Sequence, residues 1–108
     1  MATPLDAEAR THFSGDHPDW DLQGDTATRT FVFGDFAEAM GFVNRVAIVA
    51  ERADHHPDID VRWNKVTVAF STHSAKAFTD QDLALVETID AWGTGAVTGH
   101  RNPADGEG

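Results

Sequence analysis

The chain has 108 residues, of which 41% are hydrophobic and 24% charged, and this composition predicts a single globular domain. Its formal net charge of -10 argues against nucleic acid or an anionic membrane as a partner, because phosphate groups would be repelled. It has no cysteine, no apolar run that could span a bilayer and no signal-peptide pattern, so we expect a cytoplasmic protein without disulfides or sulfur-bound zinc.

We expect the first element to be a helix that begins close to the N-terminus. Thr3 is a good N-cap, Pro4 suits the first helical position, and Gly15 can end the helix. His12 and His17 have no neighbours at ligand or catalytic spacing, so we expect both rings to be exposed to solvent.

Residues 21–33 predict two strands joined by a turn at 23–25. From Thr26 onward, threonine, valine and phenylalanine alternate with a period of two, which is typical of a strand. Phe31 and Phe33 share one face of this strand. We therefore expect another element to cover that face.

The next element is the longest predicted helix, from Phe36 to about Ala53. Asp35 is its N-cap, and Glu38 completes a capping box. Two apolar stripes run along it, the first formed by Phe36, Met40, Val43, Ala47 and Ala50 and the second by Ala39, Phe42, Val46, Val49 and Ala53. Together they are wider than packing on one sheet requires, so we expect helix 36–53 to form a homodimer or homotetramer interface.

Pro57 ends this helix, and the residue before a proline is biased toward extended backbone. Two strands should follow, joined by a tight turn at residues 64–65. A hairpin folded there returns the chain toward Pro57, so that His73 comes level with His55 and His56. The pattern therefore gathers three of the six histidines at one end of a hairpin.

A last helix is predicted from its N-cap Thr79 to a stop near Gly93, and residues 94–108, including His100, show no apolar period. We therefore expect a domain over residues 1–93 and a disordered tail over 94–108. The order of elements is helix, two strands, helix, two strands, helix. It predicts an α+β fold, with three helices packed on one face of a four-stranded antiparallel sheet.

Three imidazoles gathered at one place suit either proton transfer near neutral pH or metal binding, because free imidazole has a pKa of about 6.5. Zinc requires three or four ligands in a fixed array, and adjacent side chains such as His55 and His56 rarely point at one ion. Proton transfer requires only that each ring reach a different atom of a bound molecule. Structural roles stay open, since Asp82 suits the first turn of a helix and Trp63 suits a core. The residues alone favour acid–base chemistry without excluding a metal.

The spacing of these residues resembles the signature of the pterin-4a-carbinolamine dehydratases. It reads Glu51-x3-His55-His56-Pro57-x5-Trp63-x9-His73-x8-Asp82. The segments 34–42, 45–47, 63–66 and 71–73, together with Trp20, are also similar to family segments. The resemblance covers roughly residues 5–92.

The resemblance implies a reaction and a site. Family members remove water from 4a-hydroxytetrahydropterin, and the product is quinonoid dihydropterin. Aromatic amino acid hydroxylases produce the substrate, and the reaction is a step in tetrahydrobiopterin recycling. No metal and no cofactor is implied. The implied catalytic residues are His55, His56 and His73. The implied substrate-binding residues are Glu51, Asp54, Trp63, Ser71, Thr72, Ser74 and Asp82.

The resemblance also carries an alternative function. Family members form tetramers, and some animal relatives act as dimerisation cofactors for a homeodomain transcription factor. A non-catalytic pterin-binding or protein-dimerisation role is therefore the alternative to catalysis. The sequence departs from the family at Ile59, where an aromatic residue is usual, and from Ser74 onward, where an acid and a glycine-rich turn are usual.

Overall fold

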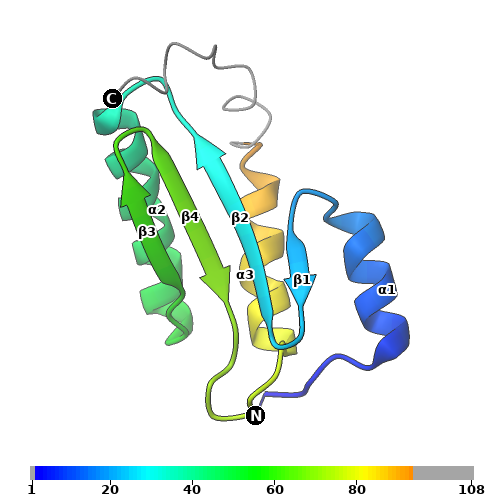
Figure 1. The fold of residues 1–108 in the computed structure, drawn as a ribbon. Helices are drawn as coiled ribbons and strands as arrows, with labels where there is room; N and C mark the ends of the chain where they lie inside the picture. Colours follow the sequence, from blue (N-terminus) through cyan, green and yellow to red (C-terminus); the bar gives the residue numbers. More distant parts are fainter. Residues whose placement is uncertain (1, 94–108) are drawn as a thin grey trace.

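The computed structural model describes residues 2–93, and the tail predicted over 94–108, with His100, lies outside the described residues. The elements are α1 (Ala7–Asp16), β1 (Asp21–Gln23), β2 (Thr26–Val32), α2 (Phe36–Ala53), β3 (Asp58–Arg62), β4 (Lys65–Phe70) and α3 (Asp80–Ala91). The predicted order of helices and strands is confirmed. In the view of Figure 1, α2 and α3 lie behind the sheet, and α1 joins this layer beside β1 at the sheet edge.

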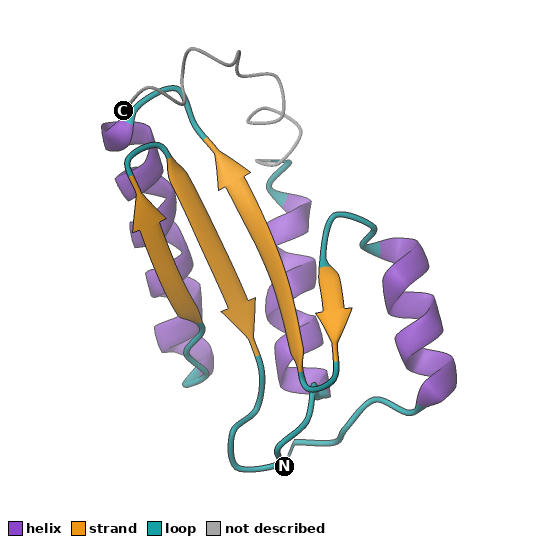
Figure 2. Cartoon of the chain, in the orientation of Figure 1, coloured by secondary structure: helices purple, strands orange, loops and turns teal. Residues whose placement is uncertain are grey.

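The sheet is antiparallel throughout, with the strand order β1-β2-β4-β3. Figure 2 shows α2 and α3 behind the sheet and α1 beside its β1 edge. On the covered face, Phe31 of β2 lies opposite Val66 of β4, and both side chains are buried in the core. On the other face the hydroxyls of Thr30 and Thr67 lie 2.8 Å apart. The predicted α+β architecture is therefore confirmed.

Both ends of α2 are set by local side-chain and backbone contacts. The carboxylate of the N-cap Asp35 accepts a hydrogen bond of 2.8 Å from the N–H of Glu38, and the Glu38 carboxylate accepts one of 2.8 Å from the N–H of Gly34. At the other end Asp54 adopts the left-handed conformation, with φ at 50°. The N–H of His55 then bonds back into the last turn of the helix. The left-handed residue directs the chain away from the helix just before the histidines.

Part of the apolar surface of α2 packs on the sheet, and part remains exposed. Ala39, Phe42 and Val46, from the second predicted stripe, are buried in the core. Phe36 is 52% exposed and Ile48, which belongs to neither predicted stripe, is 53% exposed. Packing within one chain therefore leaves the apolar side chains of Phe36 and Ile48 about half exposed.

The β3–β4 turn lies one residue earlier than the sequence predicts. Arg62 pairs with Lys65, so the turn residues are Trp63 and Asn64. Trp63 has a positive φ of 50°. Asn64 is fully buried, its side-chain N–H donates to the carbonyl of Phe33 at 2.8 Å, and its own carbonyl accepts from the N–H of Phe33. These bonds to the end of β2 fix the turn and remove Trp63 from the strand.

The N-terminal helix also differs from the prediction. Its N-cap is Asp6, whose carboxylate accepts a hydrogen bond of 2.9 Å from the N–H of Ala9. Thr3 instead lies outside the helix, where its carbonyl accepts from the N–H of Asp80 and its own N–H donates to the Asp80 carboxylate, at the start of α3. This tertiary pairing outweighs the local helix-start pattern. The prediction that His17 is exposed is also wrong, because its ring nitrogen lies 2.7 Å from the carboxylate of Asp90 in α3.

Candidate active site

The corner between α2 and β3 holds His55 in a largely buried position. Its side chain is 11% exposed, and its ring lies nearly parallel to that of Phe70, with the centroids 6.5 Å apart. Its Nε2 atom lies 2.5 Å from Oδ1 of Asp82, which is fully buried. Residues 27 positions apart in the sequence are thus joined by a short hydrogen bond.

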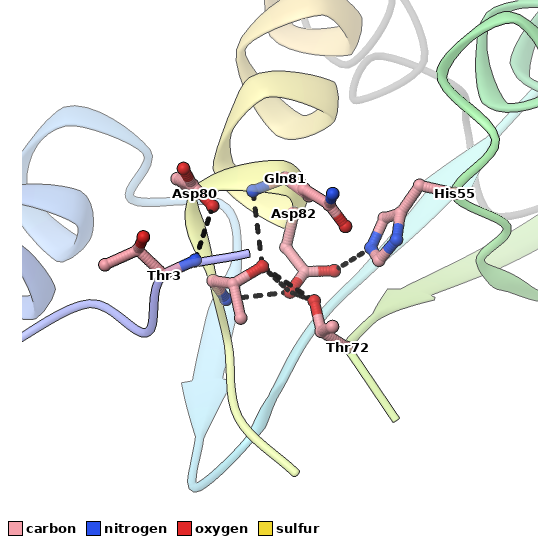
Figure 3. A network of polar contacts seen from close by, with 7 residues as sticks. Thr3, His55, Thr72, Asp80, Gln81 and Asp82 are labelled. Carbon is pink, nitrogen blue, oxygen red and sulfur yellow. Dashed lines mark hydrogen bonds and ion pairs between the residues drawn. The ribbon is translucent and has the colours of Figure 1, made fainter. Parts of the chain in front are cut away.

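Asp82 reaches this position because it belongs to the first turn of α3. It forms a capping box with the N-cap Thr79, whose N–H donates to Oδ2 of Asp82 at 2.8 Å. The hydroxyl of Thr72, which follows the end of β4, donates to the same oxygen at 2.8 Å. Figure 3 shows Asp82 between Thr72 and His55. One carboxylate therefore ties together the α2–β3 corner, the segment after β4 and α3.

His56 has a different carboxylate partner and a different environment. Its Nε2 atom lies 2.7 Å from Oε1 of Glu51, one helical turn earlier in α2. The two side chains are 58% and 80% exposed. Solvent screens such a pair, so it holds the ring much less firmly than a buried carboxylate does. The adjacent rings of His55 and His56 thus pair with separate acids, as expected for extended neighbours.

His73 is exposed and lies in the turn between β4 and α3. The N–H of Lys76 bonds to the carbonyl of His73, and Thr72 bridges to Ala77, which closes this turn. The side chain of the preceding residue, Thr72, bonds to the same carboxylate as His55. The segment that carries His73 therefore lies at the hairpin end where His55 is located.

The other predicted substrate-binding residues fall into two groups. Asp54 is exposed beside His55, and the half-buried Ser71 and exposed Ser74 flank Thr72 and His73. Trp63 lies in the β3–β4 turn, at the opposite end of the hairpin from the histidines. Within one chain the structure does not bring Trp63 to the histidines, and its substrate contact stays a prediction.

A hollow of about 420 Å³ lies against His55, between the end of α2 and the start of α3. Arg52 and Gln81 contribute polar groups to its lining, and Val49 and Leu85 contribute apolar ones. Arg52 and Gln81 lie outside the motif, so no pattern in the sequence marked them as site residues. A second hollow, of about 680 Å³, runs along the exposed face of α2 past Ile48.

Within residues 2–93, no group of three or more histidine and acidic side chains is arranged to hold a metal ion. Nor does this part of the chain contain a helix long and apolar enough to cross a membrane.

The fold and the site define an α+β protein with imidazole and carboxylate groups gathered at one end of its sheet. A sequence model of the family described as pterin 4 alpha carbinolamine dehydratase matches residues 3–92. The chain belongs to this family, and the predicted resemblance is confirmed.

Relatives from several bacteria carry provisional names as pterin-4-alpha-carbinolamine dehydratases. The one from Thermomicrobium roseum is 51% identical over 72 residues, which are 67% of this chain and 77% of the relative. The one from Chloroflexus aggregans is 44% identical over 91 residues, which are 83% of this chain and 96% of the relative. The match to these relatives thus extends over most of their length.

Two solved structures share the fold. A Brucella melitensis protein described as a transcriptional coactivator/pterin dehydratase has a TM-score of 0.77 and 30% identity, with 82% of this chain and 97% of that chain covered. A pterin dehydratase-like protein described as a RuBisCO assembly factor in the alpha-carboxysome has a TM-score of 0.58 and 23% identity, with 69% and 89% covered. The second likeness concerns the fold alone.

Proposed function

We propose that this protein removes water from 4a-hydroxytetrahydropterin to give quinonoid dihydropterin, in the recycling of tetrahydrobiopterin. The observation that supports this most directly is the pairing of the largely buried His55 with the fully buried carboxylate of Asp82. Such a carboxylate holds an imidazole in one orientation and one tautomer, which acid–base catalysis requires.

The reaction consists of two proton transfers and one bond cleavage. The hydroxyl on C4a of the pterin is a poor leaving group, so an acid must protonate it before the C–O bond breaks and water departs. The hydrogen on N5 must then leave as a proton, and its bonding pair forms the C4a–N5 double bond. Because one proton is given and one is taken, histidines can serve both steps without a redox cofactor.

We assign the first transfer to His55 and His73 and the second to His56, which also holds the pterin. The exposure of His56 and His73 supports these roles, since both rings are open to a bound molecule. The polar side chains of Glu51, Asp54, Ser71 and Ser74 lie at the same end of the hairpin and would bind the pterin ring. The buried Thr72 hydroxyl is committed to Asp82, and Trp63 lies at the opposite end of the hairpin, so within one chain neither side chain joins them. Asp82 acts by orienting His55.

We also propose that the protein assembles as a homodimer or homotetramer through α2. The exposed side chains of Phe36 and Ile48 and the hollow beside Ile48 support this interface. The same surface supports the alternative, a role as a non-catalytic dimerisation partner for another protein; the Brucella structure is described as a transcriptional coactivator/pterin dehydratase. The cytoplasmic location stays a prediction from the cysteine-free sequence.

The test is to mix the protein with chemically generated 4a-hydroxytetrahydropterin and follow dehydration by ultraviolet absorbance. We expect the wild type to accelerate the reaction, and His55→Ala and His73→Ala to lose roughly 10²- to 10⁴-fold in rate. His12→Ala is the matched control, because His12 is exposed on α1, away from the hairpin end. No acceleration by the wild type would favour the non-catalytic role, and equal rates for all variants would place the catalytic groups elsewhere.

A further inference from the structure

A line of hydrogen bonds continues from Asp82 away from His55, through two buried threonines. The hydroxyl oxygen of Thr72 lies 2.8 Å from Oδ2 of Asp82, and the hydroxyl oxygen of Thr79 lies 2.7 Å from that of Thr72. The backbone N–H of Gln81 donates to the hydroxyl oxygen of Thr79 at 3.2 Å. Both threonines are buried, with Thr79 fully so. Figure 3 shows this network from close by.

The chemistry of the groups gives these bonds one direction. An ionised carboxylate only accepts hydrogen bonds, so the Thr72 hydroxyl must donate its single hydrogen to Asp82. Thr72 then has no second hydrogen, and the short contact between the hydroxyls must be donated by Thr79. The oxygen of Thr79 in turn accepts from the N–H of Gln81. The hydrogen bonds from Gln81 through Thr79 and Thr72 therefore form a relay in which every donor points toward Asp82. Aligned bonds of this kind strengthen one another.

The relay leaves one oxygen of Asp82 for His55. Oδ2 already accepts from Thr72 and from the N–H of Thr79, each at 2.8 Å, and the Thr79 hydroxyl lies 3.4 Å from it, farther than the 2.7 Å to Thr72. Oδ1 faces Nε2 of His55, and since it can only accept, Nε2 must carry the hydrogen. In the neutral ring, Nδ1 is then the unprotonated nitrogen.

Nδ1 of His55 is also the ring atom that a substrate can reach. It forms no hydrogen bond within residues 2–93, and in this part of the chain no buried side-chain nitrogen or oxygen lacks a partner. An unpartnered nitrogen on this largely buried ring is therefore open to solvent or to a bound molecule.

We infer that Thr79 is a positioning residue for the dehydration, and that His55, protonated on both ring nitrogens, gives its Nδ1 proton to the pterin hydroxyl and is left neutral with Nδ1 bare. This inference rests on the proposed function. The Thr79 hydroxyl donates a hydrogen bond to Thr72, so the Thr72 hydroxyl can donate its own hydrogen to Asp82. The carboxylate then keeps its Oδ1 atom against Nε2, and the neutral ring keeps Nδ1 bare. Serine at position 79 would preserve the relay, whereas valine has the same branched shape and no hydroxyl.

The experiment combines kinetics with ¹⁵N NMR of histidine-labelled protein, in which ring nitrogen shifts distinguish protonated from bare nitrogens. In the wild type we expect neutral His55 to be protonated at Nε2 and bare at Nδ1. Thr79→Val should lower kcat roughly tenfold with little change in KM, which corresponds to the loss of one hydrogen bond that supports a charged group. It should also mix the two tautomers of His55. Thr79→Ser should restore both the rate and the single tautomer.

Thr11→Val is the matched control, because the Thr11 hydroxyl bonds only to a carbonyl of its own helix, on the surface of α1. A merely structural role for Thr79 as the N-cap of α3 would lower thermal stability and would also be restored by serine, but it would leave the His55 tautomer of folded Thr79→Val unchanged. The inference is overturned if wild-type His55 is protonated at Nδ1, or if folded Thr79→Val retains both the rate and the tautomer. Where the valine variant does not fold, the wild-type spectrum still tests the His55 tautomer, and Thr79→Ser with a lower rate or mixed tautomers would overturn the role of the Thr79 hydroxyl.

The two proposals fail in different ways. If the wild type does not accelerate pterin dehydration, the proposed function is wrong and the role of Thr79 in that reaction falls with it. If the wild type is active but its His55 tautomer or its Thr79→Val rate contradicts the expectation, only the positioning role is wrong.

Discussion

Replacing Asp82 by asparagine separates its structural role from its chemical one. In Asp82→Asn the amide oxygen can take the place of Oδ2 and accept from Thr72 and from the N–H of Thr79, so the cap of α3 survives. The amide nitrogen then faces His55, where the carboxylate now accepts at 2.5 Å. Because an amide N–H₂ only donates, Nε2 must become an acceptor and the hydrogen must move to Nδ1. The ring is thereby held in the wrong tautomer.

The expected stability loss is small. Two hydrogen bonds to a charged oxygen become bonds to a neutral one, at about 1 kcal/mol each, and a charge near the helix N-terminus is lost, at about 0.3–1 kcal/mol. Removing a fully buried charge relieves a desolvation cost that offsets part of this. We expect a net loss of about 2 kcal/mol or less in the free energy of unfolding, or up to about 8–16 °C in Tm for a domain of this size.

The expected loss of activity is much larger. Reversing the tautomer of a general acid or base costs on the order of 10²- to 10⁴-fold in kcat. Absorbance kinetics of 4a-hydroxytetrahydropterin dehydration and thermal unfolding followed by circular dichroism measure the two effects. Asp60→Asn is the control, since Asp60 pairs only with Arg62 on the exposed face of β3. A folded Asp82→Asn with nearly wild-type kcat would refute the reasoning and leave Asp82 as a helix cap alone.

Three further substitutions test other parts of the account. Glu51→Gln should change the free energy of unfolding by less than about 1 kcal/mol in urea denaturation, because its pair with His56 is exposed; a larger loss would show that the pair is structural. Asp90→Ala should cost about 2–4 kcal/mol by the same measurement, because it leaves the largely buried Arg29 only the more distant Asp19 at 3.4 Å and removes the acceptor of the buried Trp20 N–H. An effect below about 1 kcal/mol would contradict this. Ile48→Asp should shift the oligomer toward monomer in light scattering, and a wild type that is already monomeric would rule out the α2 interface.

The parts of the fold that local chemistry determines were predictable from the sequence. The start of α2 at Asp35, with Glu38 three residues later, is a short-range signal, and so is the stop before Pro57. The alternation through Phe31 correctly identified the covered face of β2. These features depend on residues within one or two turns of one another.

The features that the sequence analysis missed depend on contacts between distant segments. Thr3 carries a helix-start pattern, but its pairing with Asp80, 77 residues away, holds it outside the helix. The β3–β4 turn lies at Trp63 because the buried Asn64 is fixed by Phe33 at the end of β2. Neither contact leaves a local pattern in the sequence.

The site also combines features that local sequence predicts with contacts between distant segments that it does not. The capping box of Thr79 and Asp82 was readable as a helix start, and His55 was readable as an acid–base group. That the two share a short hydrogen bond, and that Thr72 donates to the same carboxylate, required the structure. Asp82 thus has two roles. Its Oδ2 atom caps α3, and its Oδ1 atom orients the ring of His55.

The central claim is that His55, held by Asp82, serves the dehydration of a pterin carbinolamine. The most direct measurement is the rate at which 4a-hydroxytetrahydropterin loses water in the presence of wild-type protein and of His55→Ala, followed by ultraviolet absorbance. The account predicts clear acceleration by the wild type and a roughly 10²- to 10⁴-fold lower kcat for the variant. A wild-type rate equal to that of buffer alone, or a folded His55→Ala as fast as the wild type, would contradict it.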